Sequence, residues 1–156
     1  KNMYRSQQTV SSPYSFSMNH RMKTNLNKLF SYLDIKNQPN KKFVLVLPPY
    51  SALYWHITKQ DGYYHHITNN IKYICRETAK YKNVRVQFFY NMDEITDLNR
   101  YSDVTHFDPK ISEYILSNLY NDQYRITTDN MNEWINQLDN IVLEYERNNA
   151  DWLNLK

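Results

Sequence analysis

Two short runs of strand-forming residues constrain the fold most. Phe43 to Leu47 is apolar at every position, and Val84 to Tyr90 is rich in valine and aromatic residues. A continuous apolar run is typical of a strand that is covered on both faces, as in a parallel sheet. Between the two runs, apolar residues recur at helical spacing over residues 62–81. Because a strand, a helix and a strand in this order favour a parallel pair, the sequence predicts an α/β domain.

The remaining segments predict further helices within a single domain. A helical pattern begins near residue 19, and two more helices are expected from Asp108-Pro109 and from about Thr128. Residues 1–18 show no period and are expected to be irregular. We find no interdomain linker or internal repeat, so residues 1–156 are interpreted as one domain.

Two strands alone are too few for a sheet that is buried on both faces. Their missing neighbours must come from residues 1–18, from another chain or from sequence absent here. We favour absent sequence, so the sheet is expected to be incomplete at its N-terminal side.

Composition excludes several classes of function. Gly62 is the single glycine, which excludes the glycine-rich phosphate loops of dinucleotide and nucleotide binding. The net charge of +3 is spread along the chain and does not predict a nucleic-acid interface. No apolar run is long enough to cross a membrane. The lone Cys75 offers neither an internal disulfide nor a zinc cluster, so no metal and no cofactor is predicted.

Three polar residues are expected to meet at one edge of the sheet. Ser51 follows the first strand, while Asp103 and His106 follow the second, and the carboxyl ends of parallel strands share one edge. A histidine beside a carboxylate can act as a general base near neutral pH. The simpler alternatives are a structural histidine near a helix start and an aspartate that caps a turn. Asp108 is expected to cap the helix that Pro109 begins.

Residues 103–106, Asp-Val-Thr-His, resemble the last motif of the SGNH (GDSL-type) hydrolases, Asp-x-x-His. The resemblance implies that His106 is the general base for a serine nucleophile and that Asp103 orients it. Residues 45–51, Leu-Val-Leu-Pro-Pro-Tyr-Ser, followed by Trp55, are similar to SGNH-like proteins encoded near bacterial cell-surface polysaccharide genes. Residues 124–127 fit the same group.

What the resemblance implies is a three-layer, flavodoxin-like parallel sheet flanked by helices. It also implies a cofactor-free esterase or acyltransferase that acts on a surface glycan in the bacterial cell envelope. The family's serine lies in a Gly-Asp-Ser or Gly-Ser-Ser motif after its first strand, and its oxyanion-hole glycine comes later. This chain has neither motif. We therefore expect the C-terminal part of such a domain, inactive without its nucleophile.

Other roles stay open for the residues around the Pro-Pro turn. Ser51 is interpreted as a nucleophile, a substrate-contacting or oxyanion-donating group, or a plain loop cap. Its large neighbour Tyr50 disfavours the strained nucleophile elbow. Tyr50, Tyr54 and Trp55 are candidate sugar-stacking residues, and aromatic packing is the alternative.

Two further hypotheses compete with the hydrolase. One is a non-catalytic module that binds a glycan or a protein through these aromatic residues. The other is a scaffold that self-associates through an exposed sheet edge. A metal site is disfavoured, because His65 and His66 are adjacent and are expected to point to different faces of a helix.

Overall fold

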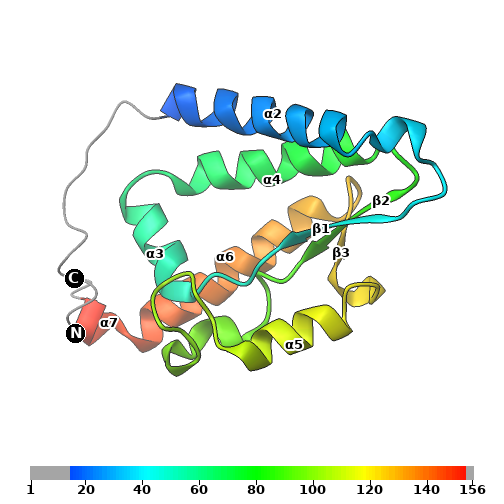
Figure 1. The fold of residues 1–156 in the computed structure, drawn as a ribbon. Helices are drawn as coiled ribbons and strands as arrows, with labels where there is room; N and C mark the ends of the chain where they lie inside the picture. The colour runs from blue at the N-terminus through cyan, green and yellow to red at the C-terminus, as the bar shows by residue number, and fades with distance from the viewer. Residues whose placement is uncertain (1–14, 154–156) are drawn as a thin grey trace.

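The computed structural model describes residues 15–153, and its architecture is α/β (Figure 1). The strands are β1 (Phe43–Leu47), β2 (Val84–Phe88) and β3 (Arg125–Ile126). The α-helices are α2 (Ser15–Tyr32), α3 (Ala52–Gln60), α4 (Tyr64–Thr78), α5 (Pro109–Ser117), α6 (Met131–Asn148) and α7 (Ala150–Leu153). Short 3₁₀ turns are η1 (Ile35–Asn37), η2 (Asp93–Thr96), η3 (Leu98–Arg100) and η4 (Asp122–Tyr124). None of the helices described in 15–153 has the length and apolar character needed to span a bilayer.

The sheet contains the predicted parallel pair and one strand that the sequence did not reveal. β1 and β2 run parallel, with Phe43 opposite Val84 and Leu47 opposite Phe88. β3 pairs antiparallel with β2 on its other side, which gives the order β1-β2-β3. The observed sheet is therefore mixed, with β2 in the middle. A strand of two residues is too short to show any period, which is why β3 was missed.

Helices cover one face of the central strand, and the loop after α5 covers the other. On one face of β2, Phe88 packs edge-to-face against Trp134 of α6, with 5.6 Å between ring centroids. On the other face, Gln87 reaches the loop that follows α5. On the predicted stripe of α4, Ile71, Cys75 and Thr78 are buried, whereas Tyr64, Ile67 and Ile74 are half-buried. Figure 1 shows α2 lying along α4, so α2 is an outer layer.

β1 is less covered than its sequence predicted. All five of its residues are half-buried, whereas four of the five in β2 are buried. The N–H of Phe43 donates to the carbonyl of Asn83 at 2.8 Å, and the carbonyl of Leu47 accepts from Phe89 at 3.0 Å. Since a parallel pair uses alternate residues of each strand, the N–H and C=O groups of Val44 and Val46 point to the other edge.

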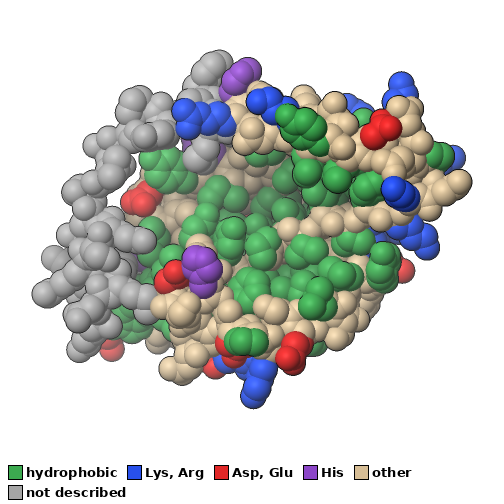
Figure 2. Space-filling view, in the orientation of Figure 1, with side chains coloured by type: hydrophobic (Ala, Val, Ile, Leu, Met, Phe, Trp, Pro, Cys, Tyr) green, Lys and Arg blue, Asp and Glu red, His purple; other side chains and the backbone are tan. Residues whose placement is uncertain are grey.

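Within residues 15–153, no strand pairs with that outer edge of β1. Figure 2 shows hydrophobic side chains gathered over it, in the band between α2 and α5. The strand is thus an open, apolar edge of the described sheet.

Two helix boundaries differ from the sequence-based expectation. α2 begins at Ser15, so the irregular segment predicted for residues 1–18 is wrong for 15–18, and residues 1–14 lie outside the described range. α3 follows the Pro-Pro turn directly, and the sequence did not predict a helix there. Gly62 separates α3 from α4 with a φ of +75°, a backbone conformation that glycine adopts without strain.

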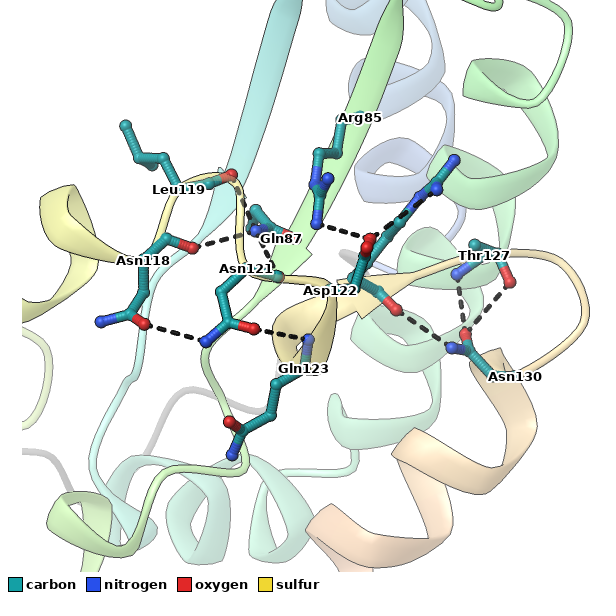
Figure 3. Close-up of polar contacts among 10 residues, drawn as sticks. Arg85, Gln87, Asn118, Leu119, Asn121, Asp122, Gln123, Thr127 and Asn130 are labelled. Carbon is teal, nitrogen blue, oxygen red and sulfur yellow. Dashed lines mark hydrogen bonds and ion pairs between the residues drawn. The ribbon is translucent and has the colours of Figure 1, made fainter.

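Gln87 fastens the sheet to the loop after α5 (Figure 3). Its side chain is fully buried, and Nε2 donates to the carbonyls of Asn118, Leu119 and Asn121 at 3.1, 2.7 and 3.0 Å. Burying an amide costs stability unless it is hydrogen-bonded, and here Nε2 is satisfied whereas the buried Oε1 has no partner among the described residues. Here the bonds satisfy carbonyls at the end of α5 and thereby fix the approach to β3.

Candidate active site

A tight loop between η3 and α5 holds Asp103 and His106 together. Oδ1 of Asp103 accepts hydrogen bonds from the backbone N–H groups of Thr105 and His106, each at 2.8 Å. Oδ2 of Asp103 lies 2.6 Å from Nδ1 of His106. An aspartate side chain that bonds backbone groups two and three residues later folds the chain back on itself. The Asp-x-x-His spacing thus lets one carboxylate shape the loop and also hold the imidazole.

The hydrogen bonds fix the protonation pattern of this pair. The backbone N–H of Thr105, then the backbone N–H and side chain of His106, hold the pKa of the Asp103 carboxyl well below its usual range. An ionised carboxylate only accepts hydrogen bonds, so Nδ1 of His106 carries the proton that faces it. In the neutral imidazole, Nε2 is then a bare acceptor. The His106 side chain is 77% exposed, and no hydrogen bond to Nε2 is found among residues 15–153.

A second set of contacts joins the two ends of the loop that holds Asp103 and His106. The N–H of Ser102 donates to the carbonyl of His106 at 2.9 Å, and the N–H of Asp108 donates to the carbonyl of Arg100 at 2.8 Å. The guanidinium of Arg100 pairs with both carboxylate oxygens of Asp108. Asp108 also accepts from the N–H of Ile111 at 3.0 Å, which confirms it as the cap of α5.

The loop after β1 and the loop after β2 meet, as predicted from the topology. The Ser51 hydroxyl donates to the carbonyl of Val104 at 2.8 Å, and the Ser51 N–H reaches the same oxygen at 3.1 Å. The hydroxyl of Tyr101 donates to the carbonyl of Pro49 at 2.6 Å. Three hydrogen bonds therefore join the Pro-Pro turn and Ser51 to the segment of Asp103 and His106.

The Ser51 side chain has a structural role, because it connects the start of α3 to the loop of Asp103 and His106. Its side chain is fully buried, and its Oγ accepts from the N–H of Tyr54 at 3.2 Å as the N-cap of α3. The hydroxyl proton is occupied by the Val104 carbonyl. Of the roles open to Ser51 from sequence, these contacts correspond to the loop cap.

The three aromatic candidates lie in one packed cluster. Trp55 is fully buried and presents no surface to solvent. Tyr50 and Tyr54 are half-buried, with ring centroids 4.7 Å apart, and Tyr50 stacks on Tyr90 at 5.8 Å. Burial raises the pKa of Tyr54 to about 12, so its phenol is protonated at neutral pH. Of the three, Tyr54 borders the cavity described next.

A cavity of about 910 Å³ lies beside the Asp103–His106 loop. Figure 2 shows this part of the surface as a hollow below α2. The loop contributes one wall, and α2, α3, α4 and the α3–α4 turn contribute the others. Its lining residues are Arg21, Met22, Asn25, Tyr54, Ile57, Thr58, Asp61, Tyr63, Ile67, Asn70, Asp103, Val104 and Thr105.

The other histidines form no metal site in the described part of the chain. His56 is fully buried, and its Nδ1 lies 2.9 Å from Oε1 of Glu146, a pairing that the sequence did not indicate. The rings of His65 and His66 lie 3.7 Å apart, so the prediction that they point to different faces is wrong. Among residues 15–153, no group of three or more His, Cys, Asp or Glu side chains is placed to hold a metal ion.

Comparison with known proteins found no matching family model, no matching curated protein and no matching solved structure.

Proposed function

We propose that this chain supplies the general-base part of an SGNH-type esterase or acyltransferase site that acts on a surface glycan. His106 is the base and Asp103 is the residue that positions it. The observation that carries the proposal is the 2.6 Å contact between Asp103 Oδ2 and His106 Nδ1, combined with an exposed Nε2. A histidine held by a carboxylate at one nitrogen and open at the other is suited to take a proton from a hydroxyl.

The proposed chemistry uses both nitrogens of the imidazole. Nε2 removes the proton of a serine hydroxyl as the serine oxygen bonds to the ester carbonyl carbon. The resulting imidazolium is stabilised by the Asp103 carboxylate and then protonates the departing alkoxide. The acyl group is left on the serine and passes to water or to a glycan hydroxyl. The strongly lowered pKa of Asp103 keeps its negative charge in place throughout.

The serine is proposed to come from sequence that precedes these residues. The sequence contains no Gly-Asp-Ser or Gly-Ser-Ser, and Ser51 is buried and bonded to Val104. The open edge of β1 supports a larger sheet, because the outward N–H and C=O groups of Val44 and Val46 need partners. A further parallel strand there would extend the sheet toward a flavodoxin-like, three-layer domain.

Fluorophosphonate labelling tests this proposal, since the reagent reacts with activated serines. Residues 1–156 alone should remain unlabelled and should hydrolyse p-nitrophenyl acetate no faster than free imidazole. A longer chain that includes the upstream serine should be labelled. Labelling should fall by roughly 10⁴-fold or more in His106→Ala and substantially in Asp103→Asn. His20→Ala, which removes an exposed histidine of α2, is the matched control and should change nothing.

Two outcomes would contradict the proposal. A longer chain whose labelling survives His106→Ala would remove the base from the mechanism. Turnover by residues 1–156 alone that is lost in both His106→Ala and Ser51→Ala would assign the nucleophile to Ser51.

A binding module is the second candidate, because half-buried Tyr50 and Tyr54 lie in contact and Tyr54 borders the cavity. It predicts saturable glycan binding, measured by tryptophan fluorescence, with no serine labelling in any version of the chain. Self-association through the β1 edge predicts a dimer by light scattering, and a monomer at high concentration would contradict it.

A further inference from the structure

We infer that the cavity beside the Asp103–His106 loop binds the acyl group of the ester substrate, and that this group is a medium-length apolar chain rather than acetyl. The inference rests on the proposed function, because it assigns the cavity to the substrate of that site. It goes beyond that function by naming the class of acyl group.

Part of the cavity wall is apolar and suits an apolar ligand, and it lies beside polar and charged residues that include Arg21, Asp61 and Asp103. Met22 of α2, Ile57 of α3, Ile67 of α4 and Val104 of the loop supply aliphatic or thioether surface from four separate segments. All four are half-buried, so each keeps apolar surface that a ligand could cover. Tyr54 and Tyr63 add aromatic surface. Burying this surface against a hydrocarbon chain is favourable in proportion to the area removed from water.

The cavity also lies in the right place relative to the base. Asp103, Val104 and Thr105 form one of its walls, and the next residue in the chain is His106. Asp103 lines the cavity, and its Oδ2 lies 2.6 Å from Nδ1 of His106, so the imidazole adjoins a side chain of the cavity wall. This position suits the acyl part of an ester whose carbonyl carbon is attacked next to Nε2.

The size of the cavity disfavours a small acyl group. A volume of about 910 Å³ is near the upper end of ligand pockets, which span about 300–1,000 Å³. An acetyl group would contact few of the apolar walls, whereas each methylene added to the chain would cover more of them. Each buried methylene strengthens binding by roughly fourfold. Three buried methylenes would therefore give a preference of roughly 60-fold over acetyl.

Neutral esters provide a probe that does not depend on catalysis. Residues 1–156 would be titrated with methyl hexanoate and with methyl acetate, and backbone amide shifts would be followed by NMR. We expect methyl hexanoate to bind at least ~50-fold more tightly than methyl acetate. The saturable shifts should cluster at Ile57, Ile67, Val104 and Thr105. Equal binding of the two esters, or shifts confined to β1, would overturn the inference.

Variants that fill the cavity sharpen the test. Ile67→Trp should weaken methyl hexanoate binding by about tenfold or more, because the indole would occupy the space of the chain. Met22→Trp fills the same cavity from α2 and should also weaken methyl hexanoate binding. It keeps the test available if Ile67→Trp does not fold. Leu116→Trp is the control on α5, where the side chain is mostly exposed outside the cavity, and it should leave binding unchanged.

Failure of this inference is distinguishable from failure of the proposed function. Methyl hexanoate binding should persist in His106→Ala, since the imidazole is not among the lining residues. If hexanoate binds as expected but the longer chain shows no His106-dependent labelling, the hydrolase is refuted and the cavity takes apolar ligands that are not its substrate. If labelling depends on His106 while both esters bind equally, the acyl assignment is refuted and the hydrolase stands.

Discussion

Replacing Ser51 by alanine should destabilise the fold, because Ser51 connects the two loops at the edge of the sheet. The change removes the N-cap bond to the N–H of Tyr54 and the hydroxyl bond to the carbonyl of Val104. Loss of a serine N-cap costs about 1 kcal/mol, within a range of about 0.5–2. Loss of the bond to Val104 costs about 1 kcal/mol more. The backbone N–H of Ser51 still reaches the Val104 carbonyl at 3.1 Å, which limits that second cost.

The expected total is about 2 kcal/mol of unfolding free energy, or a decrease of about 4–8 °C in Tm. Urea unfolding followed by tryptophan fluorescence would measure it, since Trp55 is fully buried in the folded chain. Ser31→Ala is the matched control on the exposed side of α2, and it should stay within about 0.5 kcal/mol of the wild type. A Ser51→Ala cost as small as that of the control would refute the structural role.

Three further perturbations test the fold and the site. Gln87→Leu should lower the free energy of unfolding by about 2–3 kcal/mol, measured in urea, because three carbonyls lose their hydrogen-bond donor. The control Gln123→Leu, at an exposed position, should lower it by less than about 0.5 kcal/mol. Equal losses in the two variants would contradict the role of the Gln87 hydrogen bonds. The pKa of Asp103 is lowered, so its contribution to stability is present above the ordinary value of 3.8 and is lost as the pH falls through the lower folded-state pKa. The urea midpoints of wild type and Asp103→Asn should therefore differ at pH 5, and the difference should shrink progressively as the pH falls below 3.8, whereas a constant difference would contradict this. Burial raises the pKa of Cys75 to about 11, so Ellman's reagent should react with it at pH 8 only in urea, and fast reaction with the folded chain would contradict its burial.

The parts of the fold that sequence predicted have strong local signals. The apolar run Phe43–Leu47, the residues of β2 and the Asp108-Pro109 helix start each carry their own chemistry within a few residues. The joining of Ser51 to the Asp103–His106 loop followed from parallel topology alone. Local pattern and connectivity were therefore enough for the edge where the candidate site lies.

The parts that sequence missed depend on distant partners. β3 is only Arg125–Ile126 and exists because β2 offers it an edge. α3 was not predicted because the two prolines ahead of Ser51 indicate a loop, and the buried contact of His56 with Glu146 joins residues 90 positions apart. The half-burial of β1 likewise depends on what covers the strand, which its five apolar residues do not specify.

The bonds from Ser51 to Val104 and from Tyr101 to Pro49 couple the position of the loop after β1 to that of the loop after β2. Ser51 is at once the first support of α3 and the anchor of the segment that carries the imidazole. A tilt or slide of α3 would therefore pull on the carbonyl of Val104, two residues before His106, through both the hydroxyl and the backbone N–H of Ser51.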